Sequence, residues 1–443
     1  MISTGEFEER VVGIEMEYSP SIRVFDDDRQ VTLLEVNDVN KIGGVVLQRI
    51  YKKFGLLQDS VLGSKFLGNG FAAYPDCGSV EVCTPECTPD KVGLAQLASE
   101  RIVLQTLEDI TDRDARRAYL LPLRVQDSFS PGEDYRIASS GMHENYDMQI
   151  LDYDRTSVRF FGVVRHYAAT QHVWSGQGYV DTQGSFKIAQ KTNGKTAGAE
   201  QIVRHNEGRL EFRRLNYPTT YWQLKHRMAY TSAFIRTLAF LKQSDFEKMA
   251  VIYPVISASD DAPLNLENLI IGGYSNFKSA LGFQLSLAEK VLGFAEELSF
   301  PGYETEAARE VVRICNALKD SELDSIKLDV GWVIKLLGLQ RKTPEIFSEQ
   351  RPSANVIKRA IQYCTALDSL GKGTALAAYR SRRDCDYVPR QIQNATRRPP
   401  AIRVARERAK NIRQHLRTSA DLASASWMSS EVVPVDTHFR RTN

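Results

Sequence analysis

The feature that most constrains the fold is an alternation of charged and apolar residues in three short stretches, residues 13–19, 74–86 and 209–214. Because successive side chains of a strand point to opposite faces, each stretch would place its charges on one face and its apolar residues on the other. The charged or polar positions of the three stretches include Glu15, Glu17, Tyr74, Asp76, Glu81, Arg209, Glu211 and Arg213. Half-buried strands of this kind are typical of an antiparallel sheet.

If the three strands are neighbours, one face of the sheet carries at least four carboxylates and two guanidinium groups. Such crowding is costly unless divalent cations or phosphate groups neutralise it. The pattern therefore favours a site for ATP and magnesium. The alternative for any single stretch is the solvated face of an ordinary antiparallel sheet.

Composition excludes several classes of protein. The chain has 443 residues, 42% of them apolar and 25% charged, which is typical of a globular protein with two or three domains. Its formal net charge of +2 argues against strong nucleic-acid binding by the whole molecule. No apolar run reaches the length of a membrane span, and the first ten residues lack the apolar segment of an export signal. We therefore expect a cytoplasmic protein with no membrane partner, in which the six cysteines are reduced.

Apolar periodicity predicts helices over residues 38–54, with Asp38 as the N-cap, and 91–110. Further strands are expected at residues 11–18 and 119–123. From residue 221 the chain becomes helical, with predicted helices at 222–241, 281–298, 303–318 and 326–337. We expect one catalytic domain at residues 1–375, with its sheet mainly at 11–220 and its helical part at 221–340. A small basic C-terminal domain at 376–443 follows. Its cationic helix is either a solvated face or a surface for an acidic partner or phosphates.

Two further clusters concern the same site. His143 and Asn145 are predicted on one face of a strand, with Glu144 on the other. A lone histidine is more often structural, but its polar neighbours favour a functional role here. Cys77, Cys83 and Cys87 lack a CxxC pair and a spaced histidine, so we expect buried thiols beside the site rather than structural zinc.

In order along the chain, these motifs resemble those of the family of Pup ligases and Pup deamidases (depupylases), the accessory enzymes of pupylation. The matching segments are Gly13-Ile-Glu-Met-Glu-Tyr18, Asn69 to Asp76, Glu81-Val-Cys-Thr-Pro-Glu-Cys87, His143-Glu-Asn-Tyr146, Ile361-Gln-Tyr363 and Ala423-Ser-Ala-Ser-Trp427. The family shares its catalytic sheet with glutamine synthetase and glutamate–cysteine ligase. The resemblance implies an α+β fold, with a curved antiparallel sheet whose carboxylate-lined concave face is packed by helices, and a small C-terminal domain.

The resemblance also implies the roles of individual residues. Asp76 would be the catalytic base or nucleophile. The metal-binding group would be Glu15, Tyr74, Glu81, His143 and Glu211. The ATP-binding group would be Glu17, Thr84, Arg209, Arg213 and Trp427. The cofactors implied are ATP and Mg²⁺, and the partners are a small acidic Pup-like protein, lysine-bearing protein substrates and the proteasome system.

The chain departs from the family in three places. Ala72 replaces an arginine that contacts ATP, and the span from Gln190 to Arg209 is too short for the family's Asn-Thr-Arg-Asp-Glu-Pro-His segment. Arg209-Leu-Glu211 stands where the family often has Arg-Leu-His, which is more like glutamate–cysteine ligase. The spacing from Asp76 to Glu81 resembles the deamidase branch, yet residues 20–68 show no clear counterpart of the deamidase's long loop.

Three hypotheses follow. The first is an ATP- and magnesium-dependent enzyme that forms or hydrolyses an amide or isopeptide bond at a terminal Glu or Gln of a Pup-like protein, through γ-phosphate transfer. The second is a γ-glutamyl ligase that acts on a small amine, and the third is a non-catalytic, nucleotide-binding adaptor. Ligase and deamidase stay open as alternatives within the first.

Overall fold

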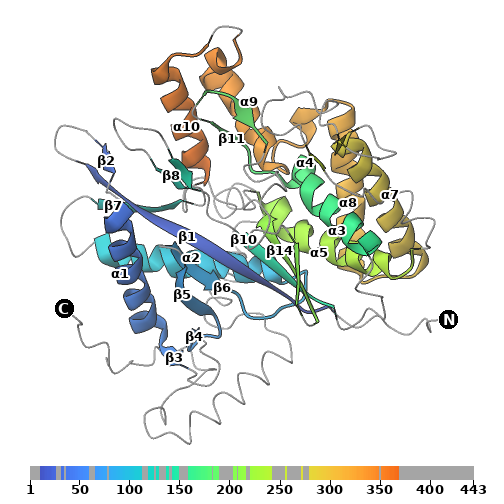
Figure 1. Ribbon diagram of the computed structural model, residues 1–443, viewed down its shortest axis with the longest axis horizontal. Helices are drawn as coiled ribbons and strands as arrows, with labels where there is room; N and C mark the ends of the chain where they lie inside the picture. The colour runs from blue at the N-terminus through green and yellow to red at the C-terminus, as the bar shows by residue number, and fades with distance from the viewer. Residues whose placement is uncertain are drawn as a thin grey trace, which may run out of the picture. The chain divides into compact units, whose positions relative to one another are not determined.

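The computed structural model describes residues 10–25, 31–33, 36–58, 65–76, 79–111, 118–123, 126–128, 136–138, 142–148, 158–181, 183–188, 203–206, 208–215, 220–241, 255–256, 271–272, 279–348 and 351–368. These residues belong to two compact units (Figure 1). The N-terminal unit lies within Gly13–Ser140, and the larger unit contains the residues up to Val12 and those within Gly141–Asp368.

The N-terminal unit is built on an antiparallel sheet. In spatial order its strands are β1 (Val12–Phe25), β6 (Ser79–Cys83), β5 (Ala72–Asp76), β4 (Lys65–Leu67) and β3 (Leu56–Gln58). The far half of β1 also pairs with β2 (Val31–Leu33) and β7 (Ala118–Leu123). A separate hairpin joins β8 (Gln126–Ser128) to β9 (Arg136–Ala138). The two helices of this unit are α1 (Val36–Phe54) and α2 (Val92–Thr111).

One face of this sheet is apolar and packs on the helices. In β1 the buried side chains alternate with half-buried ones, and Ile14, Met16 and Tyr18 are at most 2% exposed. The Tyr18 hydroxyl lies 2.9 Å from Ser99 Oγ of α2, and the Tyr51 hydroxyl of α1 donates to the Ala73 carbonyl of β5. Because side chains of a strand alternate between faces, Glu15 and Glu17 point away from these helices.

The larger unit combines a three-stranded antiparallel sheet with a set of helices. The strand order is β13 (Val203–Asn206), β14 (Arg209–Leu215) and β10 (Met142–Asp147). Two short pairs complete its described strands, β11 (Tyr179–Val180) with β12 (Phe186–Lys187) and β15 (Val255–Ile256) with β16 (Ile271–Gly272). Its helices are α3 (Val158–Thr170), α4 (His172–Ser175), α5 (Tyr221–Leu238), α7 (Ala280–Glu297), α8 (Gly302–Lys319), α9 (Gly331–Lys342) and α10 (Ala354–Asp368).

Helices α5, α7 and α8 pack side by side and bury the core of this unit (Figure 1). Tyr167 of α3 contacts the rings of Phe212 on β14 and Phe234 on α5, so α3 and α5 are joined to the sheet through aromatic packing. A buried polar network adds to this core. Glu304 of α8 accepts hydrogen bonds from Ser232 and Arg236 of α5, at 2.5 and 2.8 Å.

Most of the elements expected from periodicity are present, and two helix starts were wrong. Helix α1 begins at Val36, two residues before Asp38, so Asp38 is not its N-cap. The helix expected at 326–337 begins at Gly331, because Leu323–Ser325 forms a 3₁₀ turn and Val330 is extended. Among the described helices, none combines the length and low charge that a membrane crossing requires. The expected C-terminal domain at 376–443 lies outside the described residues.

Candidate functional site

In the N-terminal unit, three polar side chains from three neighbouring strands form one row. Glu17 of β1 is paired directly with Glu81 of β6, and Glu81 is paired with Tyr74 of β5. Directly opposed residues of antiparallel strands place their side chains on the same face. The Tyr74 hydroxyl donates a 2.5 Å hydrogen bond to Glu81 Oε1, and Glu81 is only 3% exposed. Glu17, Glu81 and Tyr74 therefore lie side by side on one face of this sheet.

A second row lies beside the first. Glu15 of β1 is paired with Cys83 of β6, and Cys83 with Ala72 of β5. The Cys83 thiol reaches the first row, because its Sγ lies 3.4 Å from the Tyr74 hydroxyl and 3.7 Å from Glu81 Oε1. Asp76 ends β5 opposite Ser79, and its side chain lies outside the described residues.

Burial of this cluster shifts two of its proton equilibria. The pKa of Tyr74 is raised far above its ordinary value, first by desolvation and then by the neighbouring Cys83 and Glu81. Desolvation, together with the negative charges of Glu81 and Glu15, also raises the pKa of the Cys83 thiol. Without a cation nearby, both groups therefore keep their protons at neutral pH.

Thr84 follows β6 and continues its pairing with β1. Its hydroxyl accepts a hydrogen bond from the Ile14 N–H at 3.0 Å, while its own N–H donates to the Ile14 carbonyl at 2.8 Å. The side chain is 9% exposed. These bonds hold the start of β1 against β6, close to Glu15 in sequence. Contact between Thr84 and ATP stays a prediction.

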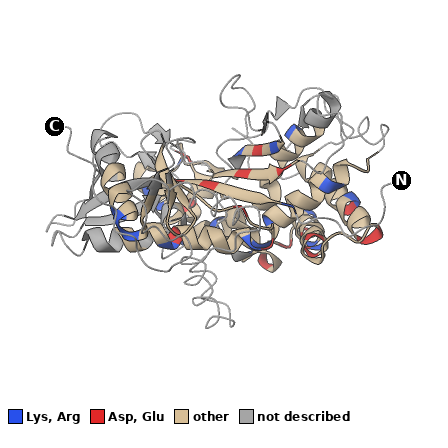
Figure 2. Ribbon diagram, turned by 90° about the horizontal axis from the view of Figure 1, so that it is seen from below, with Lys and Arg blue, Asp and Glu red and all other residues tan. Residues whose placement is uncertain are grey.

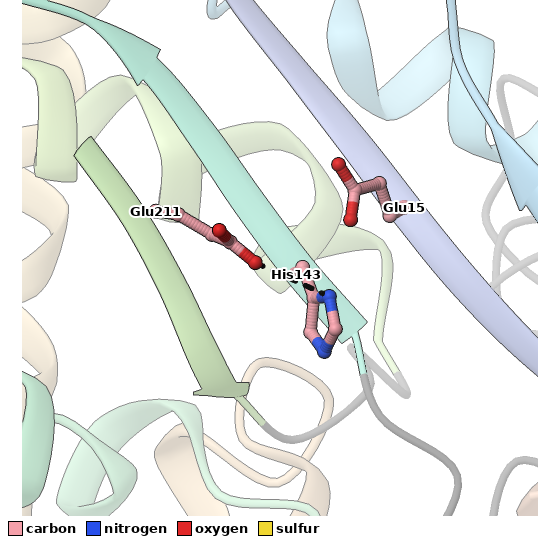
Figure 3. A group of neighbouring side chains, drawn as sticks. All are labelled: Glu15, His143 and Glu211. Carbon is pink, nitrogen blue, oxygen red and sulfur yellow. Dashed lines mark ion pairs between the residues drawn. The ribbon is translucent and has the colours of Figure 1, made fainter. Parts of the chain in front are cut away.

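In the larger unit, the carboxylate of Glu211 brings three cationic or imidazole groups together. Its Oε1 lies 3.5 Å from His143 Nδ1 and 3.2 Å from Arg213 Nε, and its Oε2 accepts a 3.1 Å hydrogen bond from Arg209. His143 lies on β10 and Glu211 on the adjacent β14, and the dashed line in Figure 3 marks their ion pair. Glu211 and His143 are 4% and 8% exposed.

The opposite face of β10 explains how His143 is held. Glu144 is fully buried, and its Oε1 lies 2.6 Å from Arg227 Nε of α5, while its Oε2 accepts from the Tyr146 hydroxyl at 2.7 Å. The pairing of β10 with β14 changes register between Met142 and Glu144. Irregularities of this kind re-aim side chains next to functional sites. The irregularity lies at His143 of β10, and the contacts of Glu144 with Arg227 and Tyr146 hold the opposite face of this strand.

The structure groups the predicted site residues into two sets, each within its own unit. Glu15, Glu17, Tyr74 and Glu81 share one face of the N-terminal unit's sheet, and His143, Arg209, Glu211 and Arg213 gather on β10 and β14. Acidic positions on the strands are drawn red in Figure 2, and Figure 3 labels Glu15 on β1. Trp427 lies outside the described residues.

Sequence reasoning missed two contributions. Arg227 reads as one charge in an amphipathic helix, and only the packing of α5 on β10 shows that it pairs with Glu144. Cys83 was expected only as a small thiol near the site, whereas its side chain contacts both Tyr74 and Glu81. A strand alternation that includes residue 83 after Glu81 was the available signal.

Comparisons with known proteins identify the fold. No family profile matches the chain, and no curated protein sequence matches it. Among solved structures, the complex between the prokaryotic ubiquitin-like protein Pup and its ligase PafA is similar, with a TM-score of 0.67 and 15% identity. That match covers 92% of this chain and 84% of the other. The Pup ligase PafA in complex with ADP is similar with a TM-score of 0.60 and 14% identity, over 86% of this chain and 84% of that one.

The chain therefore has the fold of Pup ligase, at an identity too low to carry over its activity. The α+β fold with a large antiparallel sheet, expected from the sequence motifs, is confirmed.

Proposed function

We propose that this protein is an ATP- and magnesium-dependent carboxylate–amine ligase, or a related amidase, of the pupylation type. The observation that carries the proposal is the register of Glu17, Glu81 and Tyr74 across three neighbouring strands. The motif residues selected from the sequence thus form one polar face on a fold similar to that of Pup ligase. A solvated sheet face would not hold Glu81 at 3% exposure.

The donor set fits magnesium. Mg²⁺ prefers oxygen ligands and commonly takes one or two carboxylates together with the phosphates of its nucleotide. Glu15, His143 and Glu211 each offer one ligand atom, a carboxylate oxygen or an imidazole nitrogen. Glu81 and Tyr74 add two more oxygen donors. When bound, magnesium would neutralise the negative charge of the transferring phosphoryl group.

The protein's own groups would perform the remaining steps. Arg209 and Arg213 would bind phosphate oxygens, to which guanidinium groups donate paired hydrogen bonds. Their present contacts with Glu211 hold both side chains on one face of β14. In the ligase direction a glutamyl carboxylate takes the γ-phosphoryl group of ATP, and an amine then displaces phosphate to form the amide. Asp76 would accept the proton that the amine nitrogen loses.

The substrate proposed is the terminal Glu or Gln of a small acidic Pup-like protein, with a protein lysine as the acceptor. The sequence motifs support this choice, and the ligase in the solved complex with Pup has a similar fold. A second candidate is a γ-glutamyl ligase for a small amine. It is favoured by Glu211, whose carboxylate lies beside His143 where the pupylation family often has a second histidine.

The test uses the purified protein with ATP, magnesium and a peptide of the Pup C-terminus that ends in Gln or in Glu, followed by intact mass. Conversion of the terminal amide to the acid indicates a deamidase, and a lysine adduct of the Glu form indicates a ligase. Glu15→Gln and Asp76→Asn should each abolish the product with the fold retained. Glu297→Gln, on the exposed face of α7, is the matched control.

The other outcomes choose between the alternatives. Hydrolysis of ATP with an untouched peptide, but with product from glutamate and a small amine, would favour the second candidate. Nucleotide binding without turnover of either substrate would support a non-catalytic adaptor and contradict the enzyme. Absence of any nucleotide binding would contradict the proposal as a whole.

A further inference from the structure

Helices α9 and α10 of the larger unit carry a group of exposed cations that the proposed site does not use. The two helices pack against each other, and the 3₁₀ turn Pro344–Phe347 contacts both (Figure 1). The described side chains of residues 331–368 include one carboxylate, the exposed Glu345, which pairs with Arg359 at 3.5 Å. The exposed Lys and Arg side chains of the same region are Arg341, Lys342, Arg351, Lys358 and Arg359.

The motif residue Tyr363 of α10 brings two of these cations together. Its ring lies against Gly338 of α9, where a Cβ atom would collide with the hydroxyl oxygen and with Cζ. Lys342 Nζ lies 4.8 Å from the centroid of the ring. Arg341 is close enough for its charge to oppose the rise in the Tyr363 pKa that burial causes. Because positions three and four residues apart share a face of a helix, Gly338, Arg341 and Lys342 lie on the same side of α9.

The charges of Arg341 and Lys342 are not neutralised by neighbouring carboxylates. Neither side chain forms an ion pair within the described part of the chain. Cations in the last turn of a helix offset the helix dipole, which accounts for the presence of these two. It does not account for Lys358 and Arg359, which lie nearer the start of α10, where the dipole does not favour cations.

We propose that the surface formed by Arg341, Lys342, Phe347, Arg359 and Tyr363 docks an acidic segment of a partner protein. Guanidinium, ammonium and phenol groups all donate hydrogen bonds to carboxylates. Phe347 is apolar and 38% exposed, in the same turn as Glu345, the partner of Arg359. An exposed ring beside cations suits a peptide with apolar residues among its carboxylates, whereas a phosphate backbone offers it no partner.

The inference goes beyond the proposed function, because it concerns α9 and α10 and not the strands that carry the proposed ligands. The experiment measures the fluorescence anisotropy of a labelled peptide of glutamate with interspersed leucine, mixed with the full chain without nucleotide or divalent cation. We expect binding that weakens as salt is added, and none of the same peptide with glutamine in place of glutamate.

Variants of exposed or half-buried residues test the surface directly. Arg341→Gln together with Lys342→Gln should weaken the binding of the peptide about tenfold. Tyr363→Phe removes only the hydroxyl group and should weaken it about threefold. The matched control is Arg309→Gln together with Lys319→Gln, which removes two exposed cations of α8, one of them also in a last turn. The control should bind the peptide as the unaltered protein does.

Equal losses in the α8 control would overturn the inference, because net charge alone would then explain the binding. Full affinity in the folded Arg341 and Lys342 double variant would overturn it, as would no binding by the unaltered protein. Oligothymidylate bound as tightly as the peptide would assign the surface to nucleic acid instead. Circular dichroism establishes folding, and the single variants replace a double variant that is not folded. Turnover of ATP with magnesium is measured separately, and its failure would contradict the proposed function alone.

Discussion

At the scale of single residues, Glu211 is a buried carboxylate with three charged or imidazole groups around it. Its buried carboxylate serves His143, Arg209 and Arg213 at once. Removal of the Glu211 carboxylate would leave all three groups without their shared counter-charge.

We predict that Glu211→Gln weakens the binding of Mn²⁺, a paramagnetic substitute for magnesium, by about tenfold or more. The amide keeps the shape of the side chain but loses the negative charge that a cation requires. Electron paramagnetic resonance of free Mn²⁺ measures the affinity without any turnover. Glu297→Gln should leave the affinity unchanged, and equal affinities for the two variants would contradict the role of Glu211.

His166 on α3 provides a second residue-scale case. Its side chain is fully buried, it packs edge-on against Phe283 with ring centroids 4.2 Å apart, and neither ring nitrogen has a hydrogen-bond partner among the described residues. Burial lowers its pKa from 6.5 to about 4. Between these two values the unfolded chain binds a proton that the folded chain excludes, so stability falls as the pH falls through this window.

We predict that His166→Phe reduces the loss of unfolding free energy between pH 6.5 and pH 4, the interval of the pKa shift, by up to about 3 kcal/mol. Urea denaturation at several pH values within this interval measures the effect. Some pH dependence should remain, because burial lowers the pKa of His172 and His226 to about 4 as well. Parallel curves for the variant and the unaltered protein would contradict this account.

At the scale of elements, a buried ion pair between Glu144 and Arg227 joins β10 to α5. Both side chains are at most 2% exposed, so neither charge can be hydrated once its partner is removed. We predict that Arg227→Met or Glu144→Leu alone costs about 3–5 kcal/mol of unfolding free energy.

Chemical denaturation of the two single variants and of the double variant measures this pair. The double variant should lose less than the sum of the single losses, because it leaves no uncompensated buried charge. Strict additivity of the two losses would show that the side chains do not depend on each other.

Helix α5 also has a capping box at its start. The Thr220 hydroxyl accepts from the Gln223 N–H and donates to the Asp329 carbonyl, and the Gln223 side chain accepts from the Thr220 N–H. We predict that Thr220→Ala lowers the free energy of unfolding by about 1–2 kcal/mol, measured by urea denaturation. Thr220→Ser keeps the hydroxyl and should retain most of the stability. A serine variant as unstable as the alanine variant would point to the lost methyl group instead.

At the scale of the whole molecule, the proposed ligands are divided between the two compact units. The chain passes from one unit to the other at Val12–Gly13, within β1, and at Ser140–Gly141. Glu15 lies just after the first of these points and Glu211 in the larger unit. Each of the two residues belongs to the proposed ligands and is tested within its own unit.

We predict that Mg²⁺ with ADP raises the midpoint of thermal unfolding, by an amount equivalent to about 2.7 kcal/mol at a ligand concentration near one hundred times Kd. Glu15→Gln and Glu211→Gln should each abolish the rise, and Glu297→Gln should not. Calorimetry with and without the ligand makes the measurement. A rise that survives one of the two substitutions would remove that residue from the proposed ligands.

The local pattern of residues was enough to predict strands within 13–19, 74–86 and 209–214 and to assign the side chains of each to one face or the other. A period of two is a local property, and it was visible in β1, β6 and β14 without any knowledge of their partners. The motif order also led to the correct fold. Residues 36–54 show the limit of such reasoning, because the start of α1 depends on more than the presence of a capping aspartate.

The register of the strands and the burial of the cluster depend on tertiary packing. The pairing of Glu17 with Glu81 requires two strands separated by more than fifty residues, β1 and β6, to pair at one offset, and a shift by one residue would turn each side chain to the other face. The pair of Arg227 with Glu144 and that of Glu17 with Glu81 arise from packing between distant segments, which no local pattern of the chain encodes.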